Sequence, residues 1–184
     1  MKPHLYVFEG PNGAGKTTQI KAVSKHLVTR GIPHICTKEP DIRPHGELWD
    51  TTDNVAEFFL RLASRAQHQA RVIQPALDRG LPVLMDRHWP STWVYQIRYA
   101  SAKDTKMMFG MLPRYQPPMT IFNIWCSTAT TTDRLKARRS TIPMNHADIV
   151  EGYRMVHGIR PETLIRIDGE APPSVVTHSI LFHL

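Results

Sequence analysis

The chain has 184 residues, a length that suits one compact domain with its own core. Lysine and arginine (23) outnumber aspartate and glutamate (16), giving a net charge of +7, but the cations form no tail or basic run, which favours phosphate handling over a nucleic-acid partner. Two cysteines without metal spacing exclude a disulfide framework, and the absence of a long apolar segment predicts a cytoplasmic protein with no membrane partner.

The first predicted elements are a strand, a loop and a helix. Leu5 to Phe8 is a short β-prone run, and Lys16 to Val28 carries apolar residues at helical spacing. Between them lies Gly10-Pro11-Asn12-Gly13-Ala14-Gly15-Lys16-Thr17, a complete phosphate-binding loop (P-loop). Its glycines let backbone N–H groups turn towards phosphates, while Lys16 reaches the outer phosphates and Thr17 offers an oxygen to Mg²⁺. The loop predicts ATP binding by Gly10, Pro11, Asn12, Gly13, Ala14, Gly15, Lys16, Thr17 and Thr18.

Strands and helices alternate along the rest of the chain. Strands are predicted at 34–37, 81–85, 119–125 and 164–168, and helices at 55–77, 131–139 and 173–184, the first of them bent before Pro75. Such alternation implies right-handed crossovers between parallel strands. The fold class is therefore α/β, a three-layer fold of the P-loop NTPase type with a parallel five-stranded sheet and helices on both faces, in one domain over residues 1–184.

The buried strand at 81–85 leads directly into Asp86-Arg87-His88. Sites in α/β proteins lie at the carboxyl ends of the strands, so these residues are expected to face the P-loop. Phosphoryl transfer between nucleotides needs neutralised charge and an aligned acceptor oxygen. Arg87 can clamp the acceptor phosphate or the transferring group, and Asp86 can join Thr17 in holding the metal ion. A structural ion pair is the alternative for Asp86 and Arg87.

Several short motifs follow one another along the chain: Phe8-Glu9-Gly10 through Thr17-Thr18-Gln19, Glu39-Pro40, Ser64-Arg65-Ala66-Gln67, Asp86-Arg87-His88, Ser91-Thr92 and Tyr95-Gln96. In this set the chain resembles the thymidylate kinase family, whose members transfer a phosphoryl group from ATP to deoxythymidine monophosphate (dTMP). The resemblance runs nearly end to end. It implies ATP and Mg²⁺ as cofactors, a deoxynucleoside monophosphate as substrate and a homodimer.

The resemblance also implies roles for individual residues. Glu39 would organise the acceptor side, Arg65 would reach the acceptor base or phosphate, and Tyr95 with Gln96 would close on its sugar and base. The acceptor-binding candidates are Glu39, Phe58, Arg61, Arg65, Arg87, Ser91, Tyr95 and Gln96. A short lid around 136–147 would fold over ATP, with Arg138 and Arg139 joining Lys16, Arg87 and Asp86 as catalytic candidates.

Four departures from the family pattern concern the acceptor and the lid. Arg61 stands where the family has a phenylalanine that stacks on thymine. Either Phe58 or Phe59 would take that place after a shift of the helix, or Arg61 would itself lie over the base through its planar guanidinium group. Asn12 replaces an acidic residue, Asp41-Ile42 replaces two glycines, and the short lid lacks the family's Asp-Arg-Ile-Glu-like stretch. A divergent or viral member, acting on a dUMP-type or modified deoxypyrimidine nucleotide, fits these changes. The sequence also leaves open a deoxynucleoside kinase and a nucleotide-switched regulatory ATPase.

Overall fold

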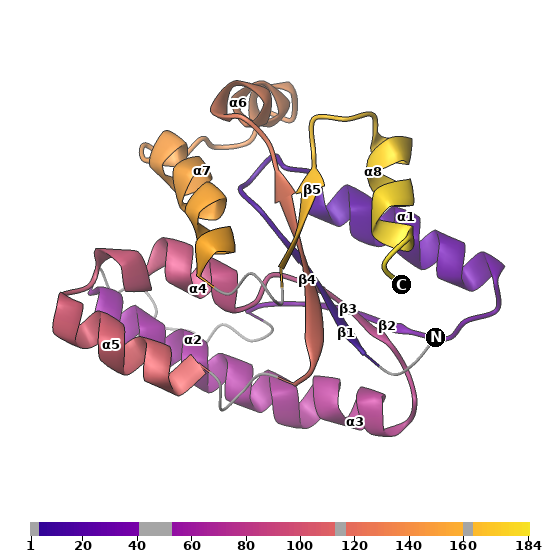
Figure 1. Cartoon of the computed structure of the whole chain (residues 1–184), viewed down its shortest axis with the longest axis horizontal. Coiled ribbons are helices and arrows are strands. Elements are labelled where there is room, and N and C mark those ends of the chain that lie inside the picture. The colour runs from indigo at the N-terminus through magenta and orange to yellow at the C-terminus, as the bar shows by residue number, and fades with distance from the viewer. Residues whose placement is uncertain (1–3, 41–52, 113–116, 160–163) are drawn as a thin grey trace.

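A parallel sheet lies at the centre of the molecule (Figure 1). The computed structural model describes residues 4–40, 53–112, 117–159 and 164–184. In this part of the chain the sheet has five strands in the order β2-β3-β1-β4-β5, and all neighbours are parallel. The strands are β1 (Leu5–Glu9), β2 (Ile35–Lys38), β3 (Val83–Asp86), β4 (Met119–Trp125) and β5 (Leu164–Asp168). The predicted five-stranded parallel sheet is confirmed.

Helices cover both faces of this sheet because its central strand β1 is apolar on both sides. Leu5 and Val7 of β1 belong to one core cluster, whereas Tyr6 and Phe8 belong to another. The second cluster is closed by α1 (Lys16–Thr29) and α8 (Pro173–Leu181). The first is closed by α2 (Asn54–His68), α3 (Gln74–Asp78), α4 (Trp89–Tyr95), α5 (Ala102–Met111) and α7 (His146–Met155). The three-layer arrangement predicted from the sequence is thus confirmed, with α6 (Thr128–Ala137) lying beyond the tips of β4 and β5 (Figure 1).

The long helix predicted over 55–77 is divided in the structure. After α2 the chain makes a π-helical turn, Gln69–Ile73, and then enters α3 with Pro75 in its first turn. Proline lacks an N–H group and its ring crowds the carbonyl group four residues earlier, so the regular ladder cannot run through Pro75. The interruption lies directly before this proline, at the place where a bend was predicted.

Several helices differ from the expected elements. The apolar pattern predicts no helix at α4, α5 or α7. Helix α6 begins at Thr128 rather than 131 because Ser127 caps it, its hydroxyl accepting from the N–H of Thr130 at 3.2 Å. Short 3₁₀ turns follow α4 (Ile97–Tyr99) and α7 (Val156–Gly158). Among the described residues, no helix combines the length and apolar character that crossing a membrane requires.

Candidate active site

The candidate motifs meet at the carboxyl edge of the sheet, as expected. Lys38 of β2 and Phe8 of β1 both pair with Asp86 of β3. The chain leaves all three strands at this level, and the N–H of Glu39 bonds the Asp86 carbonyl group at 2.9 Å. The P-loop, Glu39 and Arg87 therefore emerge side by side from adjacent strands, although they lie far apart in the sequence.

The P-loop is pressed against the end of β4 and the start of α6, and its glycines are required for this. Gly10 and Gly13 have positive φ angles of 141° and 88°. A Cβ atom would lie 2.4 Å from the Ile124 carbonyl oxygen at Gly10 and 2.7 Å from the Thr131 carbonyl oxygen at Gly13. Only glycine fits this path. Helix α1 begins at Lys16, so its positive dipole end points at the loop, as in other phosphate-binding sites.

Lys16 is held inside the loop. Its Nζ donates to the carbonyl oxygens of Gly10 at 2.9 Å and Pro11 at 3.0 Å. Burial, followed by repulsion from Arg87, lowers the pKa of Lys16 to about 7, although Asp86 and Glu9 oppose this change. The ammonium group therefore lies at the place where the outer phosphates of a nucleotide would bind.

Arg87 links the P-loop to the elements beyond it. Its Nη2 donates to Asn12 Oδ1 at 2.6 Å, and its Nη1 donates to the hydroxyl oxygens of Ser91 at 3.0 Å and Tyr153 at 2.7 Å. Its backbone has a φ of 75°, a conformation that non-glycine residues rarely adopt outside functional sites. Burial opposes its charge, but Tyr153 and Tyr95, followed by Glu9 and Asp86, together outweigh burial and raise the pKa of Arg87 above its ordinary value.

Glu9 is a site residue that the sequence analysis included only within a motif and gave no role. Its carboxylate is fully buried and accepts from the N–H of His88 at 2.6 Å and the Ser91 hydroxyl at 2.9 Å. The Tyr153 hydroxyl donates to it at 3.1 Å. Burial is the main influence on the pKa of Glu9 and raises it, while Arg87 and the hydrogen bonds oppose the change. An acidic residue directly before the P-loop, at the end of a buried strand, was the signal that could have indicated this role.

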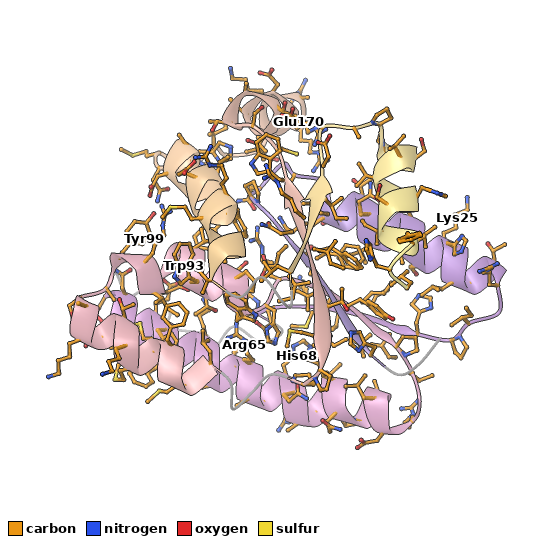
Figure 2. The ribbon with its side chains drawn as sticks, in the orientation of Figure 1. Lys25, Arg65, His68, Trp93, Tyr99 and Glu170 are labelled. Atoms are coloured by element: carbon orange, nitrogen blue, oxygen red, sulfur yellow. The ribbon has the colours of Figure 1, made fainter. Side chains whose placement is uncertain are left out.

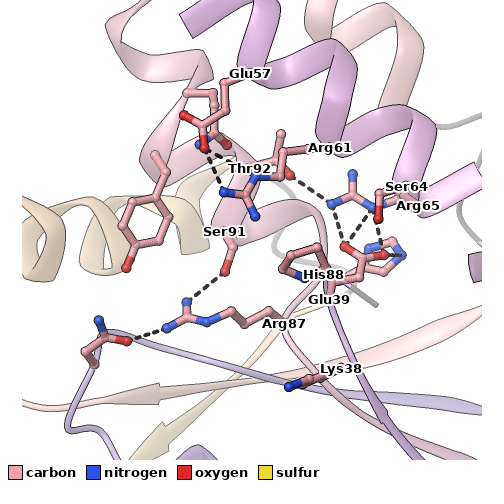
Figure 3. A pocket seen from close by; sticks show the side chains of 14 residues that line it. Lys38, Glu39, Glu57, Arg61, Ser64, Arg65, Arg87, His88, Ser91 and Thr92 are labelled. Carbon is pink, nitrogen blue, oxygen red and sulfur yellow. Dashed lines mark hydrogen bonds and ion pairs between the residues drawn. The ribbon is translucent and has the colours of Figure 1, made fainter. Parts of the chain in front are cut away.

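A cavity of about 900 Å³ opens beside Arg87 and is lined by α2, α4 and the ends of β2 and β3 (Figure 3). All the predicted acceptor residues except Phe58 line it. The lining residues are Asn12, Lys38, Glu39, Pro40, Glu57, Arg61, Ser64, Arg65, Arg87, His88, Ser91, Thr92, Tyr95 and Gln96. This volume suits a small-molecule site, and four cations among the lining residues favour an anionic ligand.

Phe58 does not face the cavity, so the expected substitution for a base-stacking phenylalanine by a helix shift does not occur there. Its ring is fully buried in the core cluster and lies edge-on to Phe59, with ring centroids 5.5 Å apart. Burying such a ring stabilises the fold by roughly 1.5–3 kcal/mol, which favours the core over the cavity. Arg61 instead occupies the cavity wall, with Nη2 2.7 Å from Glu57 Oε1.

In the cavity wall, Arg65 forms a buried ion pair with Glu39 (Figure 3). Its Nη2 lies 2.7 Å from Glu39 Oε2 and donates to the Thr92 hydroxyl at 2.8 Å. Burial is the largest single influence and raises the pKa of Glu39, but the charge and hydrogen bonds of Arg65, together with His88 and His68, outweigh burial and lower the net pKa. Arg65 Nη1 is buried and has no hydrogen-bond partner among the described residues, so it can donate to a ligand.

His88 lies against this pair and is also fully buried, with Nε2 3.9 Å from Glu39 Oε1. Burial lowers its pKa to about 3, an effect that Glu39 opposes and Arg65 reinforces. The imidazole is therefore neutral at physiological pH.

This neutral histidine is expected to make the fold acid-sensitive. Because its pKa is about 3 when folded and 6.5 otherwise, protons favour the unfolded chain, and stability is lost as pH falls from about 6.5 towards 3. In urea titrations across this range, His88→Phe should flatten the fall in unfolding free energy. His178→Phe, at an exposed position on α8, is the control. Equal slopes for wild type and His88→Phe would contradict the assignment.

Thr17 and Asp86 lie together, as the metal prediction requires. The Thr17 hydroxyl donates to Asp86 Oδ2 at 3.2 Å, and Asp86 Oδ1 is buried with no hydrogen-bond partner in the described part of the chain. No group of three or more His, Cys, Asp or Glu residues that could hold a metal occurs in the described ranges. Since Mg²⁺ in such sites takes one or two protein oxygens and completes its shell with phosphates and water, these two residues fit it.

The basic residues near the predicted lid divide into two kinds. Arg134 is a structural residue, since its Nη2 donates to the Gly169 carbonyl oxygen at 2.9 Å and ties α6 to the end of β5. Arg138 and Arg139 follow α6 with exposed side chains, for which the described residues provide no hydrogen-bond or ion-pair partner. The departure at Asp41-Ile42 lies outside the described residues.

A P-loop at the edge of a parallel sheet, facing a second cavity lined by arginines, defines a P-loop phosphotransferase acting on two nucleotides. Comparison with known proteins narrows this class. The sequence model of the family described as "Thymidylate kinase" matches residues 8–180, and the chain belongs to this family. It is therefore a kinase that binds ATP as its phosphoryl donor.

Individual relatives agree with the family match. The thymidylate kinase of Desulfovibrio desulfuricans is 31% identical over 92% of this chain and 89% of its own length. That of Shouchella clausii is 29% identical over 98% of this chain and 94% of its own length. That of Pelotomaculum thermopropionicum is 41% identical over 59% of this chain and 54% of its own length. The first two matches span nearly the whole chain.

Proposed function

We propose that this chain transfers the γ-phosphoryl group of ATP to dTMP, giving ADP and dTDP, with Mg²⁺ as cofactor. The observation that carries the proposal is the position of Arg87, which bonds Asn12 of the P-loop on one side and Ser91 of the cavity wall on the other. A phosphate in the loop and a phosphate in the cavity would both lie next to this guanidinium group. Membership of the thymidylate kinase family supports dTMP as the acceptor.

The donor side would be formed by the P-loop. Its N–H groups and the first turn of α1 would hold the phosphates of ATP, and Lys16 would exchange its bonds to Gly10 and Pro11 for bonds to phosphate oxygens. Thr17 and Asp86 would hold Mg²⁺, which neutralises charge on the phosphates when bound.

The acceptor side would be formed by the cavity. An oxygen of the acceptor phosphate would attack the γ-phosphorus while the bond from that phosphorus to the β-phosphate oxygen breaks, so that ADP leaves. Arg87 would hold the acceptor phosphate in line and offset negative charge in the transition state. Arg65 Nη1, which lacks a protein partner in the described residues, would donate to the acceptor base.

The segment 136–147 would act as the lid within this single domain. Arg138 and Arg139 are placed at the end of α6 and can swing over the phosphates in the loop, because their side chains are exposed. Closing would exclude water and so favour transfer over hydrolysis of ATP. A homodimer is proposed from the family resemblance alone, and light scattering of the purified chain tests it. A cytosolic location remains the prediction made from the sequence.

A coupled assay of ADP release tests the proposed function. With dTMP present, ADP should form at a rate at least about 10-fold above that with ATP alone, because the acceptor completes the site. A deoxynucleoside kinase would respond to thymidine instead, and a switch ATPase would release ADP at the same slow rate with or without an acceptor. Either result would contradict the proposed function.

One observation favours a second acceptor class beside dTMP. The Arg61–Glu57 ion pair lines the cavity on α2, one turn before Arg65, and only about a quarter of each side chain is exposed (23% and 26%). A methyl group packed against this pair would desolvate it without returning a hydrogen bond, whereas a hydroxyl or amino substituent could bond both partners. The second candidate is therefore a deoxypyrimidine nucleotide with a polar ring substituent.

The Arg61→Phe variant should shift selectivity towards dTMP. An apolar ring at this position would favour the methyl group and could not bond a polar substituent, a difference worth about 10-fold or more in the ratio of kcat/KM values. The assay compares dTMP with 5-hydroxymethyl-dUMP and dCMP for both proteins. A wild-type enzyme that already prefers dTMP by orders of magnitude, with an unchanged ratio in the variant, would remove this candidate.

A further inference from the structure

Two hydroxyl groups stand between Arg87 and Glu9. The guanidinium Nη1 donates to Ser91 Oγ at 3.0 Å and to the Tyr153 hydroxyl at 2.7 Å. The same two hydroxyls donate to Glu9 Oε2, at 2.9 Å from Ser91 and 3.1 Å from Tyr153. The two hydroxyl oxygens also lie 2.7 Å apart, so either can donate to the other. Both hydroxyls thus accept from the cation, and they pass its charge to the carboxylate as one connected hydrogen-bond network.

This arrangement keeps Arg87 available for a phosphate. A direct ion pair with Glu9 would use two N–H groups of the guanidinium group that could otherwise bind a phosphate. Among the described residues, Arg87 makes no direct ion pair. Through the hydroxyls, the buried carboxylate still stabilises the charge of Arg87 and fixes the direction of its side chain. The remaining N–H groups can point towards the P-loop and the cavity.

Tyr153 differs from Ser91 because it comes from another part of the chain. It lies on α7, which begins at the end of the proposed lid, whereas Ser91 lies four residues after Arg87 on α4. The Tyr153 carbonyl oxygen accepts from Asn123 Nδ2 at 2.8 Å, which fastens α7 to β4. Its side chain is fully buried, so its hydroxyl has a fixed position relative to the sheet.

The start of α7 is fastened to the acceptor side as well. Arg98, which follows α4, bonds the carbonyl oxygen of Asp148 at 2.9 Å and pairs with its carboxylate group. The Arg98 guanidinium group packs over Gly152, where a Cβ atom would lie 2.5 Å from its Nη1. The position of α7, and with it the Tyr153 hydroxyl, is therefore set jointly by β4 and by the segment that carries Tyr95.

We infer that Tyr153 is a positioning residue for phosphoryl transfer, which orients Arg87 through its hydroxyl and so makes the geometry of the transfer site depend on the placement of α7. This inference rests on the proposed function. Because Arg87 would act on the transferring group rather than on ATP binding, removing the Tyr153 hydroxyl should affect kcat more than the KM for ATP.

Tyr153→Phe tests the inference, since it removes one oxygen atom and keeps the ring. We expect kcat with dTMP to fall about 10–100-fold, the range expected when a catalytic group is misplaced, while the KM for ATP changes less than about 2-fold. Tyr6→Phe, at a buried tyrosine on β1 that the site does not use, should leave both constants unchanged.

A double-mutant cycle with Arg87→Lys separates positioning from a general structural effect. Lysine keeps the charge but cannot span both hydroxyls, so Tyr153→Phe should lower kcat by less than about 3-fold in this background. An equal loss in both backgrounds, or no loss in the wild-type background, would overturn the inference. If Tyr153→Phe does not fold, Asn123→Ala replaces it in the double-mutant cycle with Arg87→Lys, because it removes the bond between α7 and β4 without touching Arg87. The same two outcomes then support or overturn the inference. A wild-type chain that does not phosphorylate dTMP would refute the proposed function instead.

Discussion

The Lys16→Ala variant is expected to phosphorylate dTMP about 10²–10³-fold more slowly than the wild type, the loss seen when one charge-stabilising donor is removed from an active site. Lys16 is buried within the P-loop, and among the residues that the structure describes its side chain bonds only loop carbonyl oxygens, so its removal should spare the rest of the fold. Steady-state rates from coupled ADP release measure the effect.

Lys25→Ala is the matched control for this variant. Lys25 lies on the same helix with an exposed side chain that points away from the site (Figure 2). Its replacement should leave kcat within about 2-fold, and both variants should unfold at nearly the wild-type temperature. A Lys16→Ala enzyme that retained wild-type kcat would contradict the role assigned to the P-loop.

Replacing Arg65 by methionine should destabilise the fold by about 3–5 kcal/mol, because it leaves the Glu39 carboxylate buried without its partner. Arg65 and Glu39 side chains are only 2% and 9% exposed, so solvent cannot replace the lost interaction. Thermal unfolding should shift downwards by about 6–20 °C, given the size of the chain. Differential scanning calorimetry or a urea titration measures this change.

The double variant Glu39→Leu, Arg65→Met distinguishes the loss of charge compensation from the loss of packing. Exchanging both charges for apolar side chains removes the uncompensated carboxylate, so most of the lost stability should return. Arg71→Met, an exposed arginine in the π-helical turn, should have almost no effect. A double variant no more stable than Arg65→Met would mean that packing, not the charge, causes the loss.

The fold was predictable from the sequence where apolar patterns were strong. Strands β4 and β5 have the predicted bounds, because each is a continuous apolar or alternating run closed by clear breaks. Helix α4 gave no such pattern, since its Trp-Pro-Ser-Thr-Trp-Val-Tyr sequence is rich in aromatic and β-branched residues that favour strands. Tertiary packing of Trp89, Trp93 and Val94 into the core holds it as a helix.

The site was predictable as far as its motifs were local. The P-loop, Asp86 and Arg87 follow strands whose carboxyl ends share one edge, so their proximity follows from topology alone. The bond between Arg87 and Tyr153 could not be predicted from the topology. Tyr153 comes from a helix that the sequence pattern does not predict, and nothing in its neighbourhood marks a tyrosine aimed at a distant arginine. The rotation of α2, which buries Phe58 and exposes Arg61 to the cavity, likewise depends on packing.

The order of the site residues along the chain determines how such an enzyme could be rebuilt. Apart from Asn12, every described residue that lines the acceptor cavity lies in the continuous stretch from Lys38 to Gln96, while the P-loop, α6 and β5 lie before and after it. Recombination or design could therefore exchange this stretch as one cassette and change the acceptor without rewriting the ATP half. Tyr153 lies outside this stretch, but its hydroxyl bonds Arg87 and Ser91 within it. The exchanged stretch would therefore need an arginine and a serine at the matching positions.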